Sequence, residues 1–299
     1  MEILFSLRKD WFSARYFLLL QDVRRINIPN ANTQSDRRRR GISRYLIVME
    51  PLSKARIKII QSLQHKKFRL KYDKFIVEGL KINKELIRDK RQIVEEVYIS
   101  NPDYLSILEL VINPDQILTI TPQQMHQISQ MTTPPGVLSV CKLPAEDHVP
   151  EYIGGMRIFY LDAIRDPGNL GAILRVADWF GLDFVICSPD CVDIFNHKVL
   201  QGSMGSALRV KSCVMEKEEL LAIGEDHLYI CDTDGKNINL NSPPVDGIMI
   251  LGNESLGVSE DIMQRVKERY SIPAERSLGA ESLNVASAAA VIAAWWTKA

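Results

Sequence analysis

From about residue 155 to the C-terminus, short apolar runs alternate with segments of helical periodicity. This alternation predicts an α/β domain with a mostly parallel sheet, because parallel strands need a crossover connection that a helix usually supplies. In such a sheet, ligands bind beyond the carboxyl ends of the strands. The expected strands are 157–161, 184–187, 207–214, 228–231, 248–251 and 270–272. The expected helices are 170–179, 195–201, 217–223, 259–266 and 285–298.

Residues 49–147 predict a second, smaller α/β domain. Ser53 is placed to cap a helix that runs through Leu63, and Thr121 is placed to cap another, with Pro122 at its first helical position. A stretch rich in proline and charge, 144–150, indicates a linker to the larger domain. The expected strands of the smaller domain are 75–79, 94–100, 116–121 and 136–141.

Residues 1–48 differ from the rest of the chain. They hold a run of four arginines at 37–40 and a polar stretch at 27–35, without a sustained period. One hypothesis is that translation starts at Met49 and that the preceding segment is a mis-assigned start. The other is a poorly ordered basic arm that touches RNA. We prefer the first, and the mass of the natively expressed protein would distinguish the two.

The balance of charge is uneven although the net charge is zero. Through Arg91 there are 23 Lys and Arg against 9 Asp and Glu, and after it 14 against 28. A basic end favours binding to a polyanion, while a solvated charged surface explains it equally well. The sequence predicts neither a membrane span nor secretion. We expect a cytoplasmic protein without a metal site, because the cysteines lack the spacing of metal ligands. They are Cys141, Cys187, Cys191, Cys213 and Cys231.

Three polar segments, 166–175, 251–257 and 282–285, follow strand-like runs. In the first, Asn169 can cap a helix or orient a ligand, and Arg175 can be a surface arginine or a functional one. In the second, Glu254 can be a functional carboxylate or the partner of a helix dipole. The third opens into a final helix rich in small residues. None has the glycine spacing of a dinucleotide-binding turn or a P-loop, so nucleotide phosphates are not the predicted ligand.

Together these segments resemble the three signature motifs of the SpoU/TrmH family of RNA ribose 2′-O-methyltransferases. The segments 196–199 and 202–206 are similar to the family's middle region, and 75–79 and 133–137 to the ribosomal-protein-like RNA-binding domain that many members carry. Residues 1–48 match nothing in the family. The resemblance implies a C-terminal SPOUT domain at 152–299, with a mostly parallel sheet and a trefoil knot. It also implies a smaller N-terminal α/β domain at 49–147 that binds the RNA substrate.

The resemblance also implies a site. Asn169 and Arg175 match the first motif and Glu254 the second, while Ser282 and Asn284 match the polar pair of the third. S-adenosyl-L-methionine is expected in the knot, contacted mainly by backbone. The expected cofactor-binding residues are Leu251, Gly252, Asn253, Ile272 and Leu283. The loop 274–280 is longer than the family's usual loop, which leaves the cofactor contacts there open.

The implied function is methylation of a ribose 2′-hydroxyl in structured RNA, with 23S-type ribosomal RNA as the preferred target and transfer RNA as the alternative. The resemblance assigns activation of the hydroxyl to Arg175. A guanidinium stays protonated near neutral pH and is a poor general base, so Arg175 acts either through a transient proton acceptor or by orienting the hydroxyl. A catalytically silent RNA-binding protein of the same fold is the remaining alternative. A homodimer is expected, with the final helix as a contact.

Overall fold

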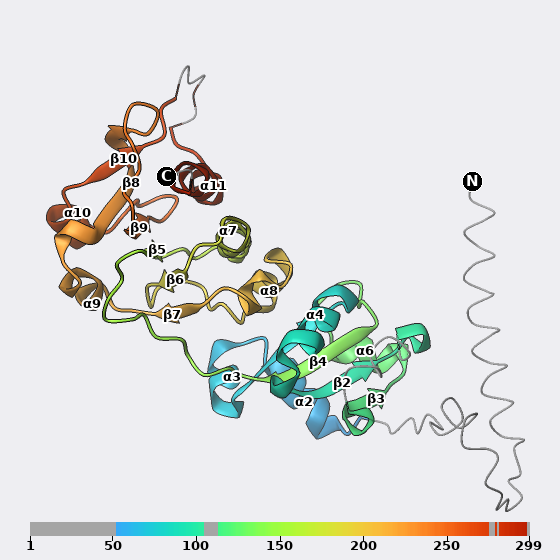
Figure 1. Ribbon diagram of the computed structural model, residues 1–299. Helices are drawn as coiled ribbons and strands as arrows, with labels where there is room; N and C mark the ends of the chain where they lie inside the picture. Colours follow the sequence, from blue (N-terminus) through green and yellow to red (C-terminus); the bar gives the residue numbers. More distant parts are fainter. Residues whose placement is uncertain (1–51, 105–112, 275–278, 280, 298–299) are drawn as a thin grey trace, which may run out of the picture. The chain divides into compact units, whose positions relative to one another are not determined.

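The structure is a computed structural model that describes residues 52–104, 113–274, 279 and 281–297 (Figure 1). All of them belong to one compact unit, Met49–Ala299. The hypotheses on residues 1–48 lie outside the described residues, as do 275–278 and 280 of the long loop. The trefoil knot, which passage through this loop would form, therefore stays a prediction. None of the described helices is long and apolar enough to cross a membrane.

The N-terminal region forms a four-stranded mixed sheet in the order β1-β4-β2-β3. Strand β4 pairs antiparallel with β1 and β2, and β2 pairs parallel with β3. The strands are β1 (Lys74–Glu78), β2 (Val94–Ile99), β3 (Ile117–Thr119) and β4 (Val137–Lys142). The helices and 3-10 turns are α2 (Lys54–Ser62), α3 (Lys66–Tyr72), α4 (Leu80–Lys90), η2 (Arg91–Ile93), η3 (Pro102–Tyr104), η4 (Pro114–Gln116) and α6 (Pro122–Ile128).

The two helix starts predicted here are confirmed. Ser53 caps α2 by accepting a hydrogen bond from the backbone N–H of Arg56 at 3.1 Å. Thr121 and Gln124 form a reciprocal capping box at the start of α6, with Pro122 in the first turn. Both caps satisfy backbone donors that a helix start leaves without partners.

The C-terminal region forms a six-stranded sheet in the order β10-β8-β9-β5-β6-β7, with every pair parallel. The strands are β5 (Arg157–Leu161), β6 (Phe184–Cys187), β7 (Ser212–Val214), β8 (Leu228–Asn237), β9 (Gly247–Leu251) and β10 (Arg269–Ser271). The helices and 3-10 turns are α7 (Pro167–Phe180), α8 (His197–Gly202), η5 (Ser206–Leu208), α9 (Lys217–Ala222), η6 (Glu225–His227), α10 (Glu260–Arg265) and α11 (Val285–Trp296). A mostly parallel α/β sheet is thereby confirmed.

The strand order places a topological switch point at the centre of this sheet. From β5 the chain proceeds outward through β6 and β7, then returns to the other side and inserts β9 beside β5. The connections that follow β5 and β9 therefore leave the same edge of the sheet side by side. Open α/β sheets bind their ligands at such a point.

Side chains of the central strands alternate between two apolar layers, as the period of a strand requires. Phe159, Leu161 and Leu251 pack with α7, α8 and α11, whereas Ile158 and Tyr160 pack on the side of α9 and α10. Figure 1 shows the two groups of helices on opposite faces of the sheet. Both faces are covered, which explains why the strands are apolar throughout.

The apolar layer beneath α7 continues into the four-stranded sheet, where it includes Phe75 and Val97. The ring of Phe75 lies 4.8 Å from that of Phe195. Arg69, which is 2% exposed, donates to Asp193 at 2.9 Å. The expected boundary near 147–152 thus separates two sheets that share one apolar cluster, and division into two independent domains stays a prediction.

The strand predicted over 207–214 is wrong in its first half. Residues 206–208 form the 3-10 turn η5, and only Ser212–Val214 pair with β6. Gly205 has a positive φ of 91°, and the tight turn that follows it closes with hydrogen bonds from Leu208 and Arg209 to Gly205 and Ser206. The apolar pattern at 207–210 arises because Ala207 and Leu208 are buried in this turn. An apolar run indicates burial, and burial alone does not distinguish a turn from a strand.

Candidate active site

Helix α7 begins three residues before the predicted start at Leu170. Asp166 is its N-cap, and its side chain accepts a hydrogen bond from the backbone N–H of Asn169 at 2.8 Å. Pro167 occupies the first turn, where its lack of an N–H is harmless. The alternative in which Asn169 caps this helix is therefore wrong, and the amide side chain of Asn169 can bond to other partners. The Asp-Pro pair was the signal that could have predicted this start.

Asn169 joins the three motifs. Its Nδ2 donates to Oε1 of Glu254, and its Oδ1 accepts from Nδ2 of Asn284 at 2.9 Å. Asn169 and its partners are separated by 85 and 115 residues in the chain, so only the fold brings them together. Asn284 is itself fixed, because its Oδ1 caps α11 by accepting from the backbone N–H groups of Ala286 and Ser287.

The turn that carries Glu254 is rigid. Asn253 and Gly257 exchange two backbone hydrogen bonds of 2.9 Å, and Nδ2 of Asn253 donates to the carbonyl of Ala163 at 2.8 Å. A Cβ on Gly252 would lie 2.4 Å from backbone atoms of Gly257 and Val258, so only glycine fits there. Glu254 is therefore held next to the N-terminal turn of α7 by the backbone that surrounds it.

Helix α7 also lies unusually close to α8. A Cβ on Gly171 would lie 2.9 Å from the backbone nitrogen of Ser203 and 3.0 Å from the carbonyl oxygen of Val199. Gly171 therefore permits a backbone approach that any side chain would prevent. The glycine in this motif packs α7 against α8, and through α7 it positions Asn169.

The hydrogen bonds that join Asn169 to Glu254 and Asn284 form the junction of the three motifs. Arg175 and Ser282 lie outside this junction. Arg175 is exposed on α7, six residues past Asn169, which places it about 120° around the helix axis and about 9 Å along it. Among the described residues, it makes no hydrogen bond or ion pair. Ser282 is exposed as well, and its side chain has no hydrogen-bonding partner in the described part of the chain. The structure thus assembles Asn169, Glu254 and Asn284 and leaves Arg175 and Ser282 facing solvent.

The segments after β9 and β10 fit an adenosine-like ligand such as S-adenosyl-L-methionine. Within the described residues, the backbone groups of Gly252, Ile272 and Leu283 make no hydrogen bonds to protein. The side chain of Leu283 is 54% exposed and offers an apolar face beside these groups. Free backbone donors and acceptors next to an apolar surface are what a purine requires.

The other two expected cofactor contacts are already engaged. The carbonyl of Leu251 accepts from the backbone N–H of Asp162 at 2.9 Å. Asn253 uses its backbone and side chain to build its own turn. Their assignment as cofactor-binding residues stays a prediction.

A cavity of about 280 Å³ lies elsewhere, lined by residues of α3, of 143–147 and of the β6 end such as Arg69, Glu146 and Cys187. None of the predicted site residues lines it. In the part of the chain that the structure describes, no group of three or more His, Cys, Asp or Glu is arranged to hold a metal ion.

Residues 156–294 match the SpoU rRNA Methylase family, and residues 54–139 match the MRM3-like substrate binding domain. The 23S rRNA (guanosine(2553)-2′-O)-methyltransferase RlmP of Bacillus subtilis is 28% identical over 249 residues, which cover 82% of this chain and 96% of the relative. The solved structure of AviRb from Streptomyces viridochromogenes with AdoMet has the same fold, with a TM-score of 0.70 at 21% identity over 82% of this chain and 98% of that one.

A putative RNA methyltransferase of the TrmH family from Porphyromonas gingivalis gives a TM-score of 0.71 at 32% identity. The similarity covers 83% of this chain and 98% of that one. The resemblance inferred from the three motifs is confirmed. With the motifs joined at Asn169 and both regions matched, this chain belongs to the SpoU/TrmH family, the SpoU rRNA methylases.

Proposed function

We propose that this protein transfers a methyl group from S-adenosyl-L-methionine to a ribose 2′-hydroxyl of structured RNA, with 23S-type ribosomal RNA as its substrate. The observation that carries the proposal is the junction at Asn169, which unites the three motifs at the switch point of the sheet. Two relatives named as 23S rRNA 2′-O-methyltransferases support the choice of RNA, the one from Bacillus subtilis and one from Streptomyces viridochromogenes.

The chain's own residues have distinct tasks in this proposal. The free backbone groups of Gly252, Ile272 and Leu283 hold the cofactor, which when bound supplies an electrophilic methyl group. Asn169, Glu254 and Asn284 fix the N-terminal turn of α7 against both cofactor-binding segments. Orientation of this kind can provide much of the rate acceleration in a reaction between two bound groups.

Arg175 acts on the ribose side of the reaction. It has no protein partner among the described residues, so its guanidinium is available to an RNA phosphate or to the 2′-hydroxyl. If a neighbouring group transiently accepts its proton, Arg175 can act as a general base toward the 2′-hydroxyl. Without such an acceptor, Arg175 orients the hydroxyl. Ser282, whose side chain has no hydrogen-bonding partner in the described part of the chain, is proposed to contact the ribose or the cofactor.

The Arg175→Ala variant should lose methyl transfer to ribosomal RNA, while cofactor affinity and melting temperature stay near those of the wild type. Transfer of a labelled methyl group measures the first, and isothermal titration with S-adenosyl-L-methionine the second. Arg265→Ala is the matched control, because Arg265 is an exposed arginine on α10, against the other face of the sheet. Turnover of Arg175→Ala comparable to the control would remove Arg175 from the mechanism.

The RNA target can be tested directly. Ribose methylation mapped across total RNA of a deletion strain should show one lost site in 23S-type ribosomal RNA. A lost site in transfer RNA would favour the alternative target. Intact methylation together with absent cofactor binding would favour a catalytically silent RNA-binding protein.

The N-terminal region, proposed as a domain at 49–147, is the part we assign to RNA binding. It matches a substrate-binding domain, and its first part, 49–91, carries 13 Lys and Arg against 5 Asp and Glu. Lysines on the exposed face of α4, Lys81 and Lys84, have no ion-pair partner among the described residues. Phosphate contacts by such side chains would make RNA affinity fall as salt concentration rises.

A cytoplasmic homodimer is the proposed form of the protein. Helices α7 and α11 contact each other, and both carry uncovered apolar side chains, Trp179 at 84% and Val291 at 39% exposure. Sedimentation should show a dimer that Trp179→Asp weakens and that Leu240→Asp, an equally exposed site on another segment, leaves intact. A wild-type protein that sediments as a monomer at assay concentration would contradict the proposed dimer.

A further inference from the structure

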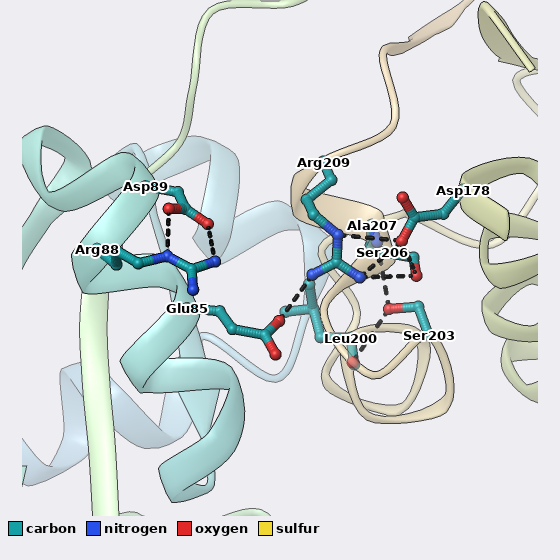
Figure 2. A network of polar contacts seen from close by, with 9 residues as sticks. All are labelled: Glu85, Arg88, Asp89, Asp178, Leu200, Ser203, Ser206, Ala207 and Arg209. Atoms are coloured by element: carbon teal, nitrogen blue, oxygen red, sulfur yellow. Dashed lines mark hydrogen bonds and ion pairs between the residues drawn. The ribbon is translucent and has the colours of Figure 1, made fainter. Parts of the chain in front are cut away.

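Arg209 holds two acidic side chains that come from different regions of the protein (Figure 2). On one side, its Nε and Nη2 donate to Oδ2 of Asp178 on α7 at 3.0 and 2.6 Å. On the other, its Nη1 donates to Oε2 of Glu85 on α4 at 2.7 Å. Helix α7 carries Asn169 and Arg175, whereas α4 belongs to the region that we assign to RNA binding.

The local backbone is shaped for this bridge. Gly205 has a positive φ of 91°, and a Cβ there would lie 3.2 Å from both Nη1 of Arg209 and Oε2 of Glu85. Ser206 donates to Oδ2 of Asp178 at 2.7 Å and thus holds the carboxylate in place. Burial alone would raise the pKa of Asp178, but hydrogen bonds from Arg209 and Ser206 lower it below its usual value. The carboxylate of Asp178 is therefore ionised and carries the negative charge that pairs with Arg209.

The other polar links between the two regions end elsewhere. Arg69 reaches Asp193, and Gln201 on α8 donates to the backbone carbonyl of Glu78 at 3.3 Å. Among the described residues, the path through Arg209 is the polar side-chain link between α7 and the four-stranded sheet region. The neighbouring pair Arg88–Asp89 stays within α4, as Figure 2 shows.

Asp178 lies three positions after Arg175, so their Cβ atoms are helical neighbours at about 5–6 Å. A planar guanidinium that binds a carboxylate on each side sets direction as well as distance, which a lysine cannot do. A shift of α4 on binding RNA would therefore act on α7 close to Arg175.

We infer that Arg209 is a positioning residue that couples the RNA-binding region, through Glu85, to the helix that presents Arg175, through Asp178. This inference rests on the proposed function. Glu85 belongs to the RNA side of the link and Asp178 to the chemical side, so their loss should appear in different kinetic constants. Arg209 should affect both.

The test is steady-state methylation of ribosomal RNA from a deletion strain with labelled S-adenosyl-L-methionine. Glu85→Gln should raise KM for RNA severalfold with kcat nearly unchanged, and Asp178→Asn should lower kcat with KM nearly unchanged. Arg209→Ala should lower kcat/KM by about tenfold, within the range typical of coupling between sites. Adding Glu85→Gln to Arg209→Ala should cause little further loss, because both remove the same link.

Lys217→Ala is the matched control. Its ion pair with Asp261 has the same 39% exposure at the basic side chain, but it joins elements of one sheet only. Arg209→Lys keeps the charge without the planar fork, so it should fold normally and still show reduced kcat/KM. Cofactor affinity should not change in any variant.

Wild-type kcat and KM in Arg209→Ala would overturn the inference. So would losses that merely follow a lowered melting temperature and disappear when Arg209→Lys or a cooler assay restores folding. A wild-type protein that methylates no RNA would instead overturn the proposed function, and with it this role of Arg209.

Discussion

Two asparagines, Asn83 and Asn169, each join separate segments through one amide, yet their surroundings differ. Asn83 is fully buried, donates to the carbonyls of Val77 and Gly79 at 3.2 and 2.8 Å, and accepts from the hydroxyl of Ser139. Asn169 is half-buried at the switch point of the parallel sheet, and its partners are side chains from loops.

The difference separates holding a fold from serving a ligand. Two of the three partners of Asn83, Val77 and Ser139, are buried, so water cannot replace the amide there if it is lost. The partners of Asn169 reach solvent, where water can satisfy them, so the amide contributes little to stability. What Asn169 supplies is a fixed relation between three segments that a ligand can use.

The largest expected effect is on stability at Asn83. Asn83→Ala should lower the free energy of unfolding by about 2–4 kcal/mol, because it leaves buried polar groups without a partner and opens a cavity. Denaturant unfolding measures this change. Asn239→Ala, at an exposed asparagine, is the control and should stay within about 0.5 kcal/mol. A small loss of unfolding free energy in Asn83→Ala would mean that the buried amide is dispensable for stability, and would contradict the contrast with Asn169.

Asn169→Ala should show the reverse pattern. We expect methyl transfer to fall on the order of 100-fold, since the loss of fixed geometry near a reacting group can cost that much. The melting temperature should stay close to that of the wild type. Asn169→Asp should be no better, because it places a second carboxylate beside Glu254. A variant that keeps its activity but melts early would assign Asn169 to the fold instead.

Elements and motifs were predictable from the sequence wherever a local cause determines them. The caps at Ser53 and Thr121 follow from side chains that bond the first turn, and the parallel sheet follows from alternating segments. The failure over 207–214 has a tertiary cause. The turn at Gly205 and η5 places Arg209 between Asp178 and Glu85, and no local sequence pattern predicts these long-range contacts.

The candidate site was predictable as a set of residues and not as an arrangement. The three motifs indicate which side chains matter, but the strand order that places β9 beside β5 depends on long-range packing. The sequence therefore could not tell that Asn169 lies at the centre or that Arg175 lies outside its hydrogen-bond network. Partners as distant as Arg209 and Glu85, 124 residues apart, leave no linear signal at all.

Two glutamates repeat the contrast between the asparagines. Glu254 is exposed and bonds to Asn169, whereas Glu78 is 4% exposed at the end of β1. Glu78 accepts hydrogen bonds from the hydroxyl of Ser129 and from the backbone N–H of Gln130 at 2.8 Å. Burial raises the pKa of Glu78 above its ordinary value of 4.5, although these hydrogen bonds act in the opposite direction.

The smallest expected effect is a pH dependence of stability that originates at Glu78. Above pH 4.5 the folded protein binds more protons at Glu78 than the unfolded chain does, so its contribution to stability falls until the pH passes the raised pKa. Glu78→Gln should remove this decline. Denaturant unfolding of both proteins from about pH 4 to about pH 8 should show the wild type losing stability relative to the variant as pH rises, then a constant difference. Parallel curves across the range would mean that Glu78 titrates alike in the folded and unfolded states, and would contradict the raised pKa of Glu78.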